Sequence, residues 1–91
     1  MTDVADFDTW AAGLTPTSAT VTELSSGLMK AEGFLASDNR IWFGTRTALE
    51  QDLTRLNSQV LTSPATAAEK VGDIRAIASR IDAAVAHGDT P

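Results

Sequence analysis

The chain has 91 residues, with twelve acidic side chains against seven Lys and Arg, and a net charge of −5. This length predicts one domain, and the charge disfavours binding to DNA, RNA or an anionic membrane surface. With no cysteine and a single histidine, the usual zinc sites and thiolate chemistry are excluded.

We expect the protein to be cytoplasmic or assembled into a particle such as a virion, with leaderless secretion as the alternative. Its first residues are acidic and lack the basic region and apolar run of a secretory signal. No stretch approaches the roughly 20 apolar residues that a membrane-spanning helix needs. We therefore expect neither a membrane nor a nucleic acid as its partner.

Apolar residues in the first part of the chain recur at steps of three and four, the spacing of one helical face. They are Val4, Phe7, Trp10, Ala11 and Leu14. Asp3, Asp6 and Asp8 would lie in the first turns, where the helix dipole favours negative charge. We predict a short helix or arm within residues 1–15, and the alternative is a loosely ordered tail that docks through Phe7 and Trp10.

A second helix has two alternative start signals. Thr15-Pro16 offers a threonine N-cap with proline at the first helical position, whereas Thr20-x-x-Glu23 is a capping box. Apolar residues then follow at heptad-like spacing. They are Val21, Leu24, Leu28, Ala31 and Leu35. Gly27 either weakens this helix or lets a neighbouring helix come close, and Ser37-Asp38-Asn39 favours a turn.

The stretch Arg40–Thr47 holds three consecutive bulky apolar residues, Ile41, Trp42 and Phe43. No regular helix or strand points three neighbours in one direction, so at least one of them must face elsewhere. We predict a helix-to-helix corner or a minimal hairpin over residues 40–47, with Gly44-Thr45 at the bend. Trp and Arg are enriched in binding hot spots, which indicates a contact surface. The alternative is that Trp42 plugs the open end of a helical bundle.

Two further helices are expected. The capping box Thr47-x-x-Glu50 opens a helix that ends near Thr62, because Pro64 disfavours helical geometry at the residue before it. Ser63-Pro64 and the box Thr66-x-x-Glu69 predict the start of the next helix, which ends at His87 before Gly88. The apolar positions of these two helices are Leu49, Leu53, Leu56 and Val60, then Ala67, Val71, Ile74, Ala78, Ile81 and Val85.

These patterns predict an all-α fold, a small bundle of three main helices plus a short N-terminal helix or arm. We expect a single domain over residues 1–91. It divides into an arm (1–15), a helix-corner-helix unit (16–62) and a C-terminal helix (63–88). Small residues on the last helix bury little apolar area, so the core is expected to be thin.

Catalytic and cofactor signatures are missing from the sequence. It contains no Gly-x-Ser-x-Gly, Gly-x-Gly-x-x-Gly or Walker pattern. The aspartates of the first turns lack the ligand spacing of an EF-hand loop. His87 is interpreted as a cation at the negative end of a helix dipole. We predict that the protein is not an enzyme, with no catalytic residue, cofactor, metal or small-molecule substrate.

Two family resemblances involve the stretch Arg40–Thr47. Trp42-Phe43-Gly44, between helical segments of an acidic, cysteine-free chain, resembles the Trp-x-Gly motif of the WXG100 proteins exported by type VII secretion. That resemblance implies a helical hairpin that pairs as a dimer, with Trp42 and Gly44 in the hairpin turn.

Residues 20–62 resemble small phage head-to-tail joining proteins of the lambda type. The likeness lies in an amphipathic helix, a short bulky segment, Gly-Thr-Arg-Thr, and a helix that carries Asp52-Leu53-x-x-Leu56. It implies a helix, a small hairpin and a second helix in a subunit that docks in a ring at the portal.

We therefore predict a non-enzymatic protein–protein interaction module, a structural or adaptor subunit of a larger assembly such as a phage head–tail connector. Its partner would be another protein or further copies of the same chain. The expected contact residues are Arg40, Ile41, Trp42, Phe43 and Arg46, with Phe7 and Trp10 as a docking arm. One alternative is a WXG100-like secreted dimer. Another is an acidic inhibitor or anti-defence protein that mimics nucleic acid in a basic groove.

Overall fold

The computed structural model describes residues 4–36 and 41–87, and its regular elements in those ranges are all helices. They are α1 (Val4–Gly13), α2 (Val21–Leu35), α3 (Phe43–Thr62) and α4 (Ala67–His87). The chain is therefore all-α, as the sequence predicts. The expectations for Asp3, the turn at residues 37–39, Arg40 and Gly88 lie outside the described residues.

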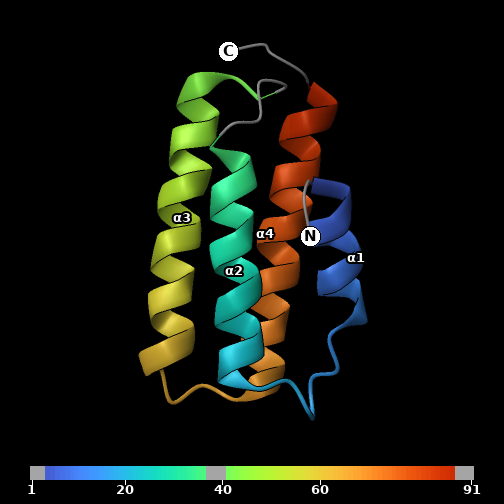
Figure 1. Cartoon of the computed structure of the whole chain (residues 1–91), viewed down its shortest axis with the longest axis vertical. Helices are drawn as coiled ribbons and strands as arrows, with labels where there is room; N and C mark the ends of the chain where they lie inside the picture. The colour runs from blue at the N-terminus through green and yellow to red at the C-terminus, as the bar shows by residue number, and fades with distance from the viewer. Residues whose placement is uncertain (1–3, 37–40, 88–91) are drawn as a thin grey trace.

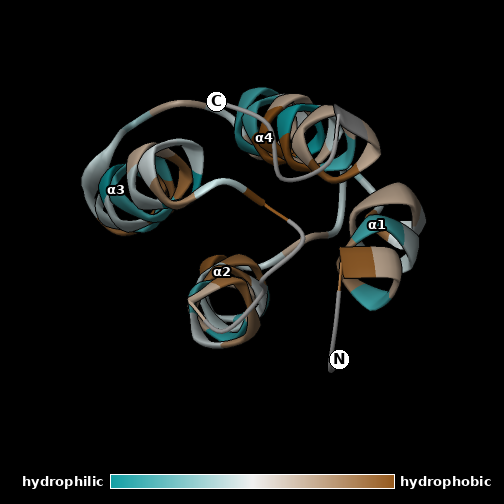
Figure 2. Ribbon diagram, turned by 90° about the horizontal axis from the view of Figure 1, so that it is seen from above, coloured by the Kyte–Doolittle hydropathy of each residue, from teal (hydrophilic) through white to brown (hydrophobic). Residues whose placement is uncertain are grey.

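The four helices surround one common centre (Figures 1 and 2). Each packs on its neighbours in chain order, and α1 and α4 pack on each other to complete the ring. In Figure 1, α1 and α3 run downwards while α2 and α4 run upwards, so neighbouring helices are antiparallel. At 1.5 Å per residue α1 is only about half as long as α3. It therefore covers only part of the side that α2 and α4 present.

Threonine caps define the starts of two helices. Thr20 Oγ1 accepts a hydrogen bond from the Glu23 amide at 3.2 Å, so α2 begins at the capping box. The alternative start at Thr15-Pro16 is wrong. The Thr15 carbonyl instead accepts the amides of Ser18 and Ala19, which makes a turn between α1 and α2.

The same chemistry sets the start of α4. Thr66 Oγ1 accepts from the Glu69 amide at 3.2 Å, and the helix begins at the next residue, Ala67. The hydroxyl of Ser63 accepts from the Ala65 amide at 3.1 Å, so Ser63-Pro64 belongs to the connection after α3 and not to α4. The predicted cap at Ser63 is therefore three residues before the observed cap at Thr66.

Removal of the α2 cap has a definite expected cost. Thr20→Ala should lower the free energy of unfolding by about 1 kcal/mol, because it leaves a first-turn amide without its acceptor. Urea denaturation followed by far-UV circular dichroism would measure this change. Thr17→Ala, in the exposed turn before α2, should change stability by less than about 0.5 kcal/mol. Equal effects of the two substitutions would contradict the capping assignment.

The minimal hairpin expected at residues 40–47 is also wrong for the described part of that stretch. The helix α3 already begins at Phe43, so Gly44-Thr45 lies in its first turn, where the Arg46 amide donates to the Trp42 carbonyl at 2.8 Å. The capping box at Thr47 therefore lies inside the helix. The predicted end at Thr62 is confirmed.

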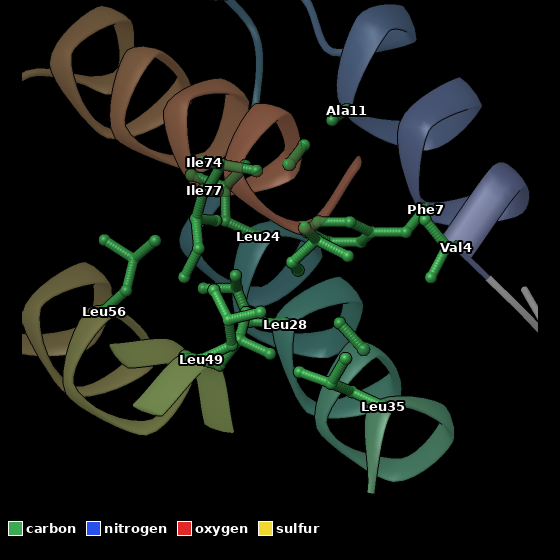
Figure 3. Packing of buried hydrophobic residues seen from close by; sticks show 14 of the residues in the cluster. Val4, Phe7, Ala11, Leu24, Leu28, Leu35, Leu49, Leu56, Ile74 and Ile77 are labelled. Carbon is green, nitrogen blue, oxygen red and sulfur yellow. The ribbon is translucent and has the colours of Figure 1, made fainter. Parts of the chain in front are cut away.

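Side chains from all four helices and the segment before α3 fill the core (Figure 3). Most of the predicted apolar positions are buried in it, although Val21, the first residue of α2, is 40% exposed. Ile41 joins the core from outside any helix. The core residues are Val4, Phe7, Ala11, Leu14, Leu24, Leu28, Ala31, Leu35, Ile41, Leu49, Leu53, Leu56, Val60, Val71, Ile74, Ile77, Ala78 and Ile81.

Candidate functional site

The three bulky residues before and at the start of α3 point in different directions. Ile41 is only 2% exposed and packs in the core, whereas Trp42 is 42% and Phe43 69% exposed. The backbone of Trp42 is extended (φ −56°, ψ 138°), and Phe43 opens the helix. The chain thus changes geometry between these neighbours, which separates one core anchor from two surface aromatic side chains.

Gly44 determines where the Trp42 side chain lies. A Cβ atom at Gly44 would lie 2.5 Å from Cζ3 and 2.6 Å from Cη2 of the indole. The indole therefore rests directly on the first turn of α3, on space that only a glycine leaves open. Ile41, and not Trp42, is the residue of this stretch that enters the bundle.

Phe43 carries a cation above its ring. The guanidinium carbon of Arg46 lies 5.7 Å from the centre of the Phe43 ring, within the range of a cation–π interaction. Arg46 is one turn further along α3, so the helix itself sets this geometry. We call Trp42, Phe43 and Arg46 the aromatic patch.

The predicted docking arm packs inside the fold. Phe7 is fully buried, and its ring stacks on Trp10 with centroids 5.6 Å apart. The indole of Trp10 lies over Gly27, where an added Cβ would come within 2.1 Å of Cζ2. Gly27 therefore does allow the close approach that the sequence suggests. Phe7 and Ile41 are inaccessible in this fold, and Trp10 is half-buried against α2.

A second apolar surface lies between α2 and α3. Met29 and Leu61 are 59% and 55% exposed, and they border a groove of about 470 Å³. Its other lining residues are Thr22, Ser25, Ser26 and Lys30. Nearby, the Ser25 hydroxyl donates to Asn57 Oδ1 at 2.7 Å and joins the two helices. We call this surface the Met29–Leu61 groove.

This groove was not predicted from the sequence. Met29 and Leu61 each follow a core residue directly, so they lie beside the apolar stripes that identify the core faces of α2 and α3. The sequence did carry one signal of an exposed apolar stripe on α3. Leu61 follows Phe43 by about five helical turns, which places both on the same stripe of α3. The aromatic patch and the groove thus lie towards opposite ends of one helix face.

An ion-pair network joins α3 to α4 through the carboxylate of Asp52. Asp52 pairs with Arg55 at 2.7 Å on the same helix and with Arg80 of α4 at 2.6 Å. Within residues 4–36 and 41–87, no three His, Cys, Asp or Glu side chains gather as a metal site would require. In the same ranges, no helix combines the length and apolar character needed to span a bilayer.

No family model, curated protein or solved structure matches the chain. The resemblances to phage head-to-tail joining proteins and to WXG100 proteins therefore remain predictions.

Proposed function

We propose that the protein is a non-enzymatic protein–protein interaction module that binds a protein partner through the aromatic patch. The observation that supports this most is that two of the five aromatic residues, Trp42 and Phe43, are exposed. Burial of a Phe side chain contributes roughly 1.5–3 kcal/mol. Phe43 forgoes most of that stabilisation in the free chain, and a partner with an apolar recess would recover it.

The chemistry around the aromatic patch favours a carboxylate at the rim of that recess. The first-turn amides of a helix carry partial positive charge, and the N-cap residue of α3, Trp42, has no side-chain acceptor for them. The Arg46 guanidinium lies in the same turn and is held over Phe43. An acidic side chain of the partner would interact favourably with both groups.

An adaptor subunit is the form of this function that we favour. The order of α2, a short connection and α3 agrees with the resemblance to phage head-to-tail joining proteins, although the hairpin of that family is not formed in residues 41–47. The WXG100 alternative calls for one long helix after Gly44. Here α3 ends at Thr62 and α4 starts at Ala67, so we place that alternative second.

Substitutions in the patch should weaken binding while the fold stays intact. We expect Phe43→Ala and Trp42→Ala each to reduce the affinity for the partner at least about tenfold, as hot-spot residues do. A photo-cross-linking amino acid at position 43 would capture the partner, and titration calorimetry with the purified pair would give the affinities. Leu61→Ala, at an apolar site near the other end of α3 whose exposure of 55% lies between those of Trp42 and Phe43, is the matched control and should bind normally. If Leu61→Ala abolishes binding while both aromatic variants bind normally, the aromatic patch is not the contact surface.

Gly44→Ala tests the geometry of the patch separately from its composition. The new Cβ would displace the indole of Trp42, while alanine raises helix propensity by up to roughly 1 kcal/mol. We therefore expect unchanged or higher stability together with weaker binding. Gly72→Ala, where a Cβ meets nothing within 4 Å, should raise stability and leave affinity unchanged. Full affinity in Gly44→Ala would show that the position of the indole does not matter for binding.

A further inference from the structure

The short helix α1 is held at its C-terminal end by a single arginine of α4. Arg75 Nε donates to the Ala11 carbonyl at 3.2 Å, and its Nη2 donates to the Leu14 carbonyl at 2.8 Å. These carbonyls lie at the end of α1, where helices lack internal donors and carry partial negative charge. Arg75 thus fixes one end of α1 to α4.

A pair of carboxyl groups lies in a groove between α1 and α4. Asp8 of α1 and Asp82 of α4 both line this groove, where the two helices pack on each other. Oδ1 of Asp8 is buried and finds no hydrogen-bond partner among the described residues. The pKa of Asp8 is raised from 3.8 to about 6. The largest cause is burial, and the hydrogen bond with Asp82 and repulsion from the charge of Asp82 add to it. One proton between the two groups therefore favours the packed arrangement.

No other charge in this groove offsets the carboxyl pair. The described residues that line the groove are Asp8, Ala11, Ala12, Arg75, Ala78, Ser79 and Asp82, and among them Arg75 is the only cation. Arg75 precedes Asp82 by about two helical turns and is engaged by the α1 carbonyls. The charged residues that face α1 from α2, Glu23 and Lys30, line the groove on the other side of α1 with Asp6.

We propose that α1 is a proton-controlled latch: it packs firmly on α4 while Asp8 is protonated beside Asp82, and it opens more often once Asp8 is ionised. This device is separate from the aromatic patch and does not depend on the proposed function. The ring of Phe7 points from α1 into the core (Figure 3), so opening would expose the part of the core that this ring covers.

The direction of the pH effect follows from the raised pKa of Asp8. Below about pH 4, Asp8 is protonated in both the packed and the open chain, so its burial does not weaken the packing of α1 on α4. As pH rises towards 6, the open chain releases the proton more readily than the packed chain, so packing of α1 loses stability. Above about pH 6 the loss is complete. The packing of α1 on α4 is therefore more stable at pH 5 than at pH 7.5.

Native-state hydrogen exchange, corrected for the intrinsic pH dependence of exchange, would test the latch. In the wild type we expect the protection factors of α1 amides to fall at least about fivefold between pH 5 and pH 7.5 relative to those of α3. Asp8→Asn should remove this fall, because an uncharged amide beside Asp82 donates a hydrogen bond at every pH. Asp82→Asn should make the fall smaller without removing it, because burial, the largest cause of the raised pKa of Asp8, remains in that variant.

Asp73→Asn is the matched control, since it removes the same charge from an exposed site of α4 in the groove towards α3. It should leave the pH dependence of α1 protection as in the wild type. The proposal is overturned by equal α1 protection at both pH values in the wild type. It is equally overturned by a pH dependence that survives in Asp8→Asn, or that Asp73→Asn also removes.

Discussion

Phe7→Ala is expected to lower the free energy of unfolding by about 3–5 kcal/mol, the range for loss of a buried aromatic side chain. Phe7 is fully buried and its ring stacks on Trp10. The centroids of the Phe7 and Phe34 rings lie 6.2 Å apart, which joins α1 to α2. Its removal would leave a cavity where α1 meets α2 and α4. Because the short α1 buries few other large side chains, we expect most of its packing to be lost in this variant.

Phe43→Ala is the matched control, the same substitution at a site that is 69% exposed. It should change stability by less than about 0.5 kcal/mol. Urea denaturation, followed at several wavelengths, would give the change in the free energy of unfolding for both variants. Hydrogen exchange would show whether α1 opens first in Phe7→Ala. A loss of stability at Phe43 as large as that at Phe7 would mean that Phe43 is part of the core, and the exposed aromatic patch would not exist.

Gly27→Ala and Gly33→Ala should change stability in opposite directions, although both place alanine in the interior of α2. On helix propensity alone, each would stabilise by up to about 1 kcal/mol. At Gly33 a Cβ meets nothing within 4 Å, so that gain is expected. At Gly27 it would lie 2.1–2.5 Å from three atoms of the Trp10 indole, which must then leave its stack on Phe7. Overpacking of this kind typically costs about 1–3 kcal/mol.

Thermal and urea denaturation of the two variants would measure the difference, and the Trp10 fluorescence of a Trp42→Phe background would report whether the indole moves. We expect a red-shifted emission in Gly27→Ala and an unchanged one in Gly33→Ala. Stabilisation by both substitutions, with unchanged emission, would show that Trp10 does not pack on α2 as described.

Helices and most of the core could be predicted from the sequence because both depend on local signals. The steps of three and four identify core residues such as Leu28 and Leu53 directly. The caps at Thr20 and Thr66 act over three residues, so the sequence alone locates them. Where two start signals compete, as at Ser63 and Thr66, local preference is not decisive, and this is where the predicted boundaries failed.

The start of α3 could not be predicted because packing overrides propensity there. Gly44, Thr45 and Thr47 are poor helix formers, and with Ile41 and Trp42 they indicate a hairpin. Burial of Ile41 fixes the chain just before α3, and the core residue Leu49 holds the first turns in place.

The surface features depend on contacts between residues distant in the sequence. Nothing local distinguishes Ile41, a core residue, from its exposed neighbours Trp42 and Phe43. The same holds for Asp8, whose partner Asp82 is brought to it only by the packing of α1 on α4. The sequence could therefore indicate that the stretch matters, but not which of its side chains remain accessible.

Hydroxyl-radical footprinting of Phe43, in the free protein and in its complex with the partner that the cross-linking variant identifies, tests the central claim most directly. The wild-type chain is used for the footprint, with buried Phe7 as the internal reference. We expect Phe43 to be oxidised far more readily than Phe7 in the free protein, and to become protected when the partner binds. Equal protection of the two rings in the free chain, or no change at Phe43 on binding, would contradict the account.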